Sequence, residues 1–199
     1  MMKNLIVPGK FVSQMHPVAR SHFQRWAEYM YKNIQFGMQD SVIHEAAHCE
    51  RVLLYAMLIA LQRFADDEQA FTILAHAAIF HDTRRVDDGQ DIGHGARAAA
   101  YYEEFCREHP ELTYFPEAAI IMRYHDRSDK AGEAAISEAF ADFSERVRLL
   151  YHILKDADAL DRWRLGRYGL DPDYLRTNEA IHLIGFARIL VARTLPADW

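Results

Sequence analysis

The sequence predicts an all-α fold, and three observations lead to this prediction. Alanine, with 28 residues, far outnumbers valine, with 8, and this balance favours helix over sheet. The segments 18–109 and 117–171 contain no proline, so long helices can run through them without a break. Apolar residues recur at steps of three and four along these segments, which is the period of a helix with one buried face.

Local signals separate the expected helices. Asp66 and Asp67 lie between the second and the third, and Pro110 follows the end of the fourth. Pro116 suits the first turn of the fifth, because a proline there loses no helical hydrogen bond. The polar stretch 83–93 contains two glycines and is expected to be a loop. The expected helices span residues 19–35, 42–64, 68–82, 94–108, 117–125, 131–142, 143–160 and 173–194.

Five of these helices carry an apolar stripe whose members are three or four residues apart, and each is expected to bury that stripe. The aromatic residues of 22–36 are likewise expected to be core. The five stripes are Val52, Tyr55 and Ile59; Phe71, Ala75 and Ala78; Ala98, Tyr101 and Phe105; Ala118 and Ile121; and Val147, Leu150 and Leu154.

Length and charge limit the classes of protein that the chain can belong to. Its 199 residues suit a single domain over 1–199. The net charge of −6 argues against stable binding of nucleic acid by bulk electrostatics. It leaves room for a small anionic substrate held by a local basic cluster. The oligomeric state cannot be read from the sequence.

The cysteines and the apolar runs indicate a cytoplasmic protein. Cys49 and Cys106 both lie in helical segments, which suggests reduced thiols. The start of the chain has no sustained apolar run and no small-residue cleavage site, so no signal peptide is expected. The apolar run 52–61 is too short to span a bilayer.

Histidines and aspartates extend the five apolar stripes, each at or near one end of its helix. In chain order they are His48 at a start, His81 and Asp82 at an end, His94 at a start, His125 at an end and Asp158 near an end. If neighbouring helices are antiparallel, the start of one lies beside the end of the next. We therefore expect these six side chains at one end of an up-down bundle.

Two interpretations of this convergence remain open. Each histidine can be a core residue whose ring is satisfied by hydrogen bonds, with Asp158 paired to Arg51 or Lys155. Six such side chains in one place would, however, compete for partners. A divalent metal ion satisfies imidazoles and carboxylates together, and both are ordinary ligands of first-row metals.

The same residues resemble the motif of the HD-domain superfamily of metal-dependent phosphohydrolases. The family pattern is a histidine, then a His-Asp pair after a helix of small and apolar residues, then a distant aspartate. Here these are His48 in HCERV, His81-Asp82 in ILAHAAIFHD and Asp158 in KDADAL. Members with two metals add two histidines before the last aspartate, and His94 and His125 fit those positions.

The resemblance covers about residues 44–162 and implies an HD-domain helical bundle with a core at about 42–162. Asp158, rather than Asp156, is the expected ligand, because A-D-A-L matches the closing motif and Asp156 lies off the stripe. The N- and C-terminal helices would then pack on this core.

The resemblance also implies a cofactor and a reaction. His48, His81, Asp82 and Asp158 would hold one divalent ion, and Asp82, His94 and His125 a second. Mn, Mg, Fe, Co, Ni and Zn are not distinguished. Two such ions lower the pKa of a bridging water and stabilise a phosphoryl transition state. The implied function is hydrolysis of a phosphate ester of a nucleotide or another small phosphorylated metabolite.

Four basic residues are candidates for contact with the phosphate. Arg84 and Arg85 directly follow the His-Asp pair, and Lys155 is a further candidate. Arg51, one turn from His48, is expected to neutralise a ligand carboxylate or to touch the phosphate. The alternative is that these are solvated charges of loops and helix ends.

The sequence departs from the motifs of two HD subfamilies, and this argues against their substrates. The guanosine tetraphosphate hydrolases carry Glu-Asp shortly after the pair, where this chain has Arg85-Val86. The cyclic-di-GMP branch needs a GYP-bearing signature and paired histidines, where this chain has Tyr124-His125-Asp126. The segment 93–100 looks like that of small bacterial HD hydrolases.

Three alternative functions fit parts of this sequence. His44-Glu45-Ala46-Ala47-His48 spells the zinc-protease motif HExxH, but Glu50 stands where that motif normally has an apolar residue. A di-iron oxygenase resembling myo-inositol oxygenase would use the same order of ligand types. A non-catalytic helical ligand-binding module would keep the fold without the chemistry.

Overall fold

The computed structural model describes residues 5–38 and 46–195. The regular elements of these residues are all helices, so the predicted all-α class is confirmed. They are α1 (Gly9–Gln14), α2 (Pro17–Asn33), α3 (Ala46–Arg63), α4 (Glu68–Phe80), α5 (His94–Glu108), α6 (Pro116–Tyr124), α7 (Asp129–Ala139), α8 (Ser144–Leu160) and α9 (Asn178–Thr194), with two 3₁₀ helices, η1 (Asp161–Leu165) and η2 (Pro172–Tyr174).

Most of the predicted helix boundaries agree closely with the structure. The prediction for 94–108 coincides with α5. The prediction for 117–125 differs from α6 by one residue at each end, and that for 143–160 differs from α8 by one residue at its start. The predicted loop 83–93 contains no helix. The predicted start of 42–64 falls outside the described residues, and α1, η1 and η2 were not predicted.

Helix caps explain the larger differences. Ser128 accepts the backbone N–H of Ala131, so α7 begins at Asp129 instead of residue 131. Thr177 likewise accepts the N–H of Ala180 and starts α9 five residues later than predicted. The stretch 172–174 ahead of it forms the separate turn η2.

Helix α4 lies at the centre of the molecule. Between Ala70 and Phe80 every side chain except that of Thr72 is buried. A helix that is apolar all round is surrounded by other elements, and α4 contacts α2, α3, α5, α6 and α8. Side chains that follow α4 directly, beginning with His81, are therefore held inside the protein.

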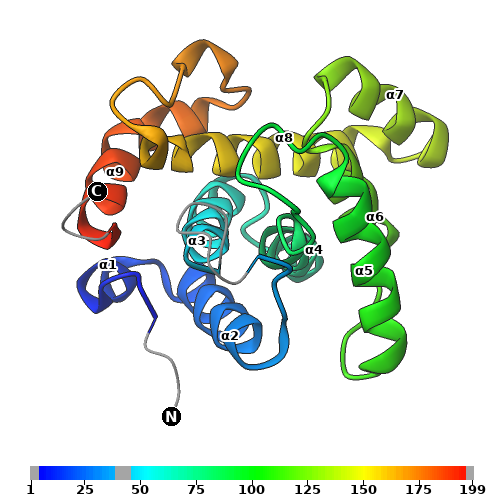
Figure 1. Cartoon of the computed structure of the whole chain (residues 1–199), viewed down its shortest axis with the longest axis horizontal. Coiled ribbons are helices and arrows are strands. Elements are labelled where there is room, and N and C mark those ends of the chain that lie inside the picture. The colour runs from blue at the N-terminus through cyan, green and yellow to red at the C-terminus, as the bar shows by residue number, and fades with distance from the viewer. Residues whose placement is uncertain (1–4, 39–45, 196–199) are drawn as a thin grey trace.

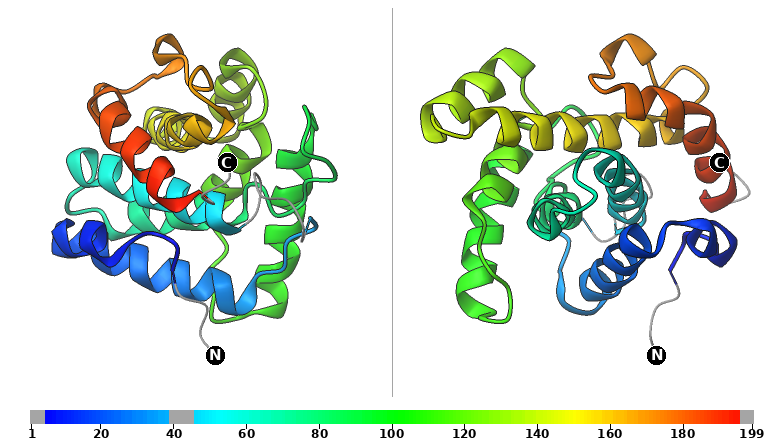
Figure 2. Two further views of the ribbon diagram at one scale, coloured as in Figure 1. Left: turned by 60° about the vertical axis from the view of Figure 1, so that its left-hand side comes forward. Right: turned by 180° about the vertical axis from the view of Figure 1, so that it is seen from behind.

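The helices do not form the up-down bundle that the sequence suggested. Figure 1 shows α3 and α4 nearly end-on, whereas α8 crosses above them and α5 and α6 run down one side. The rotated views in Figure 2 show the same crossing of α8 over the α3–α4 pair. Neighbours are still paired, with α3 on α4 and α5 on α6. Helices of different pairs are not parallel to one another, so the arrangement is one of crossing pairs instead of an up-down bundle.

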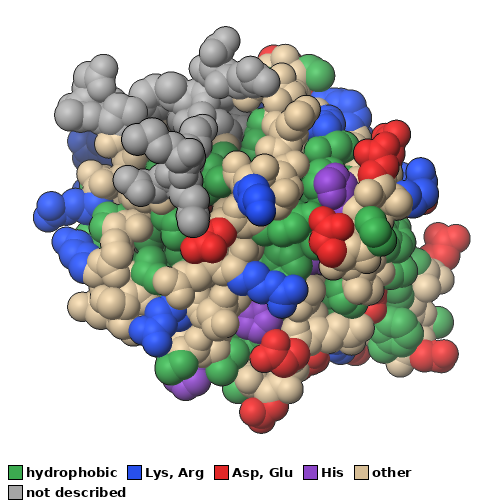
Figure 3. Space-filling view, turned by 90° about the horizontal axis from the view of Figure 1, so that it is seen from below, with side chains coloured by type: hydrophobic (Ala, Val, Ile, Leu, Met, Phe, Trp, Pro, Cys, Tyr) green, Lys and Arg blue, Asp and Glu red, His purple; other side chains and the backbone are tan. Residues whose placement is uncertain are grey.

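The remaining features concern the surface. None of the helices in the described part of the chain is long and apolar enough to cross a membrane. Basic and acidic side chains are interspersed over the face seen in Figure 3. Cys49 and Cys106 are free and buried.

Candidate metal centre

Five helices contribute their ends to one buried polar cluster. His48 lies in the first described turn of α3, and His94 is the first residue of α5. His81 and His125 are the C-caps of α4 and α6. Asp82 follows His81, and Asp158 lies in the last turn of α8. All are buried except Asp158, whose side chain is 31% exposed.

The first ligand group consists of His48, His81 and Asp82. His48 Nε2 lies 3.1 Å from His81 Nε2 and 3.5 Å from Asp82 Oδ2. Asp158 Oδ1 approaches the same His48 nitrogen to 3.3 Å. The structure therefore brings together the four residues that the family resemblance assigns to one ion.

The second ligand group consists of Asp82, His94 and His125. His94 Nε2 lies 2.8 Å from His125 Nε2 and 3.0 Å from Asp82 Oδ1. Asp82 belongs to both groups, because its Oδ2 faces His48 and its Oδ1 faces His94 and, at 3.9 Å, His81. Both buried groups could hold a metal ion.

Backbone and carboxylate acceptors orient all four imidazole rings. His81 Nδ1 donates to the Ala78 carbonyl at 2.8 Å, His94 Nδ1 to that of Asp91 at 2.7 Å, and His125 Nδ1 to that of Met122 at 2.7 Å. His48 Nδ1 donates to Asp161 at 2.7 Å. A neutral imidazole carries one N–H, so each ring turns the lone pair of Nε2 toward the cluster.

This arrangement fits a cation better than it fits a closed set of hydrogen bonds. The Nε2 atoms meet in pairs at 3.1 and 2.8 Å, and when the rings are neutral with their protons on Nδ1, neither member of a pair has a proton to donate. A divalent cation accepts both lone pairs together with the carboxylate oxygens. The donor set of imidazole nitrogens and carboxylates suits a first-row transition metal.

The electrostatics of the cluster favour the neutral form of His81, which a ligand needs, and the protonated form of His125. Burial lowers the pKa of His81 to about 3, which keeps this ring neutral. The pKa of His125 is raised, because the hydrogen bond and charge of Asp82 outweigh the effect of burial. A proton on His125 therefore competes with a metal ion, and metal binding would release it.

Asp161 is a residue of the site that the sequence analysis missed. It is fully buried at the start of η1, and its carboxylate accepts from His48 Nδ1 and from Arg51, with Nε at 2.6 Å and Nη2 at 2.9 Å. Burial alone would raise its pKa, but the charge of Arg51 and the His48 hydrogen bond hold the pKa at about 2. The spacing Asp158-x-x-Asp161 was the available signal, since residues three apart share a helix face.

Asp126 is a second missed residue. Its carboxylate accepts the backbone N–H of Gly93 and lies 3.7 Å from His94 Nδ1. Gly93 is the N-cap of α5 with φ +104°, a conformation that favours glycine. Asp126 therefore fixes the start of α5, and with it the position of His94.

Gly95 lets the two helices of the second ligand group approach. A Cβ atom at this position would lie 2.5 Å from the Met122 carbonyl oxygen and 2.9 Å from His125 Nδ1. Any larger residue would push α5 away from the end of α6.

The two arginines that follow Asp82 point to different places. Arg85 is buried, with Nη1 3.7 Å from Asp82 Oδ1 and 3.4 Å from His94 Nε2. The Gly89 carbonyl accepts from its Nη2 at 2.6 Å and holds the side chain in position. Arg84 instead stacks 3.2 Å over the Tyr101 ring and donates to the Gln35 carbonyl. Arg85 therefore lies at the cluster, whereas Arg84 is bound elsewhere.

Arg51 and Lys155 also have structural partners. Arg51 is fully buried and donates two hydrogen bonds to Asp161. It therefore neutralises the carboxylate that orients His48. Because it is buried, its guanidinium is not accessible to a phosphate. The Asp158–Arg51 and Asp158–Lys155 pairs considered above are not formed. Lys155 donates to Asp129 at 2.7 Å and to the Arg127 carbonyl at 2.6 Å. Burial lowers the pKa of Lys155.

Asp156 has a structural role, which supports the choice of Asp158 as the ligand. It is fully buried and accepts from the backbone N–H groups of Arg176 and Thr177. These bonds tie the start of α9 to α8.

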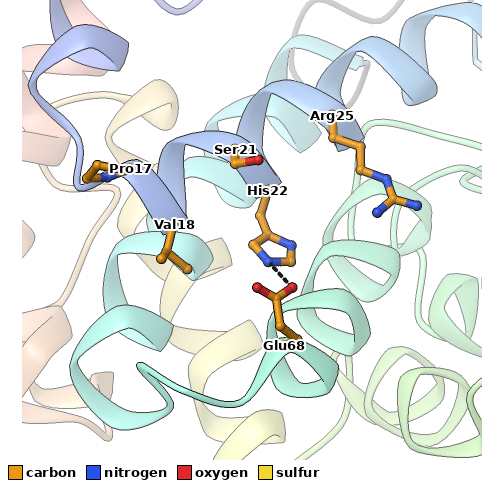
Figure 4. Close-up of a pocket in the computed structure, with 6 residues that line it drawn as sticks. All are labelled: Pro17, Val18, Ser21, His22, Arg25 and Glu68. Atoms are coloured by element: carbon orange, nitrogen blue, oxygen red, sulfur yellow. Dashed lines mark ion pairs between the residues drawn. The ribbon is translucent and has the colours of Figure 1, made fainter.

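A separate polar pocket lies between α2 and the start of α4 (Figure 4). His22 Nε2 lies 2.9 Å from Glu68, and Ser21 and Arg25 line the same pocket of about 360 Å³. With one imidazole and one carboxylate, this pocket has fewer ligand side chains than either ligand group.

Comparison of the chain with protein-family models, with curated proteins and with solved structures gives no match. The observations that bear on function are therefore those of the cluster itself. Of the HExxH motif, His44 and Glu45 lie outside the described residues.

Proposed function

We propose that this protein is a metal-dependent phosphohydrolase of the HD type, which hydrolyses a phosphate ester of a nucleotide or another small phosphorylated metabolite. One observation carries the proposal: two buried ligand groups share the carboxylate of Asp82, and their four histidines all present Nε2. The order of these residues along the chain is that of two-metal HD proteins.

Each residue of the cluster would have a defined role in this proposal. His48, His81 and Asp158 would bind one divalent ion, and His94 and His125 would bind a second. Asp82 would bind both ions. Bound divalent ions supply a hydroxide nucleophile near neutral pH and stabilise charge on a transferring phosphoryl group. Asp161 and the three backbone carbonyls accept the Nδ1 protons, so each ring in its neutral form presents the lone pair of Nε2 to the cluster.

Arg85 is the phosphate-binding residue in this proposal. Its guanidinium is buried beside Asp82 and His94, where water screens charge weakly. Guanidinium groups bind phosphate oxygens through two parallel N–H groups. A permanent positive charge beside the ligand groups favours an anionic substrate, and this supports phosphate hydrolysis over oxygen activation.

A phosphate-release screen tests the proposal. The protein is loaded separately with Mn²⁺, Mg²⁺, Co²⁺, Ni²⁺, Zn²⁺ and Fe²⁺ and assayed with a panel of nucleotides and sugar phosphates. We expect phosphate release in the wild type and its loss in Asp82→Asn, with Arg84→Gln as the matched control that retains activity. Oxygen consumption with iron and no phosphate release would instead establish the oxygenase alternative. Neither activity with any metal would leave a non-catalytic module.

A further inference from the structure

One carboxylate of the ligand cluster also lines a surface pocket. Asp158, 3.3 Å from His48 Nε2, stands in the wall of a pocket of about 480 Å³ formed by the end of α8 and the segment 168–176. Its side chain is 31% exposed, against 4% for Asp82. A pocket of this volume is in the usual range for small-molecule sites. Asp158 therefore belongs both to the lining of this pocket and to the cluster.

The pocket is held in shape by bonds to α8. The Asp156 carboxylate accepts from Arg176 N at 3.0 Å and from both the N–H and the hydroxyl of Thr177 at 2.8 Å. Arg162 Nε donates to the Gly169 carbonyl at 2.8 Å. Because these bonds fix the segment 168–176 on both sides, the pocket exists without a ligand.

Most of the charged side chains that line the pocket already have partners. Lys155 and Arg176 are both paired with Asp129, at 2.7 and 2.8 Å, and Arg176 also bonds Asp156. Asp158 is directed at His48. The other two charged residues of the lining are Arg162, which is positive, and Asp171, which is negative. The pocket therefore suits a neutral polar group better than a second phosphate.

Two exposed aromatic side chains complete the lining. Tyr168 is 82% exposed and Tyr174 69% exposed, and both line the pocket beside Arg162 and Asp171. Exposed rings of this kind stack on flat ligands. Arg162 can donate a hydrogen bond and Asp171 can accept one, so the pocket complements a flat ring that has both acceptors and donors on its edge.

We propose that this pocket binds the nucleobase of a nucleoside monophosphate whose phosphate lies at the ligand cluster, and that Arg162 and Tyr174 select the substrate. This inference rests on the proposed function, because it places the phosphate at the cluster. It adds a recognition site for the part of the substrate that is not transferred.

The first test measures binding and needs no turnover. The four common ribonucleosides, which lack a phosphate, are titrated into the protein as purified, and into Arg162→Gln and Tyr174→Ala. We expect at least one nucleoside to bind, and each variant to weaken its binding by about five- to a hundredfold, the usual effect of removing a stacking partner. Both side chains are exposed, and circular dichroism checks that the variants fold.

Matched controls come from another pocket of the same protein. Tyr114 and Arg123 line a pocket of about 450 Å³ between α6 and α7. Tyr114→Ala and Arg123→Gln remove the same groups there and should leave nucleoside binding unchanged. Equal binding in all five proteins, or no nucleoside binding, would overturn the inference.

A second test separates this inference from the proposed function. In the phosphate-release assay, the two pocket variants should raise KM for the nucleoside monophosphate and leave kcat and the hydrolysis of ribose 5-phosphate unchanged. Nucleoside binding that depends on Arg162 and Tyr174, without any phosphate release, would uphold the pocket and refute the phosphohydrolase. Release from both substrates that neither variant alters would refute the pocket and uphold the phosphohydrolase.

Discussion

His48 donates Nδ1–H to the buried carboxylate of Asp161 over 2.7 Å, and this single bond determines which nitrogen His48 turns to the cluster. Arg51 neutralises the same carboxylate through two hydrogen bonds. The three residues come from α3 and η1, far apart in the chain, and they form the support on which the first ligand group rests.

Removing Asp161 should lower both the stability of the fold and its affinity for metal, and a double variant separates the two effects. Asp161→Ala leaves Arg51 buried without its counter-charge and should destabilise the fold by about 3–5 kcal/mol. It should also lower metal affinity about ten- to a hundredfold, because His48 loses the bond that orients it. The double variant Arg51→Met/Asp161→Leu replaces the pair with apolar groups and should recover most of the stability but not the affinity. Full metal affinity in the double variant would show that the bond does not orient the ligand. Denaturant unfolding and metal titration measure the two quantities.

Gly95→Ala should weaken the second ligand group. A Cβ atom there meets the Met122 carbonyl and the His125 ring, so α5 and α6 must separate and His94 must move from His125. Gly185, in α9, has nothing within 4 Å of the equivalent atom and serves as the control. Gly185→Ala should stabilise the protein by about 0.5–1 kcal/mol without changing metal content. Metal analysis of both variants checks this, and equal metal content would refute the role of Gly95.

Arg85→Gln and Arg84→Gln form a matched pair of neighbouring substitutions. Loss of the Arg85 guanidinium beside Asp82 should reduce kcat/KM for phosphate release by about a hundredfold or more, the usual effect of removing one group that stabilises the transition-state charge. Arg84 is stacked on Tyr101, and its variant should keep the wild-type value. The reverse order of the two activities would exclude Arg85 as the phosphate ligand.

Stability should fall in acid because of His76, which lies outside the ligand groups. Burial lowers its pKa from 6.5 to about 3, so between these values the unfolded chain binds a proton that the folded protein does not. Unfolding free energy therefore decreases as the pH falls from 6.5 to 3, by at most about 5 kcal/mol from this group. His76→Gln removes the titration, so the difference in stability between wild type and variant should depend on pH within this window and be constant above it. Parallel curves would show that His76 does not titrate in this way.

Helix periodicity was sufficient to find the residues of the buried cluster but not the groups that surround them. The four histidines of the cluster lie in line with apolar stripes, so their burial at helix ends could be predicted. His48 and His94 precede their stripes, and His81 and His125 follow theirs. Asp161 lies past the end of α8 in a 3₁₀ turn, so its spacing of three residues from Asp158 was the signal for it.

Features that depend on the conformation of loops could not be predicted from the sequence. Arg84 and Arg85 are neighbours with the same chemistry, and only the turn after α4 sends one to Tyr101 and the other to Asp82. The pocket beside Asp158 depends in the same way on how the segment 168–176 returns to α8. Neither can be deduced from spacing, because both depend on contacts between distant segments.

The most direct test of the metal centre is anomalous X-ray scattering from crystals grown with Mn²⁺. We predict an anomalous peak within bonding distance of the Nε2 atoms of His48 and His81, and a second beside His94 and His125. The peaks should disappear in Asp82→Asn, which removes the shared charge. Crystals that contain manganese elsewhere, but show no peak at these nitrogens, would contradict the assignment of the cluster as a metal centre.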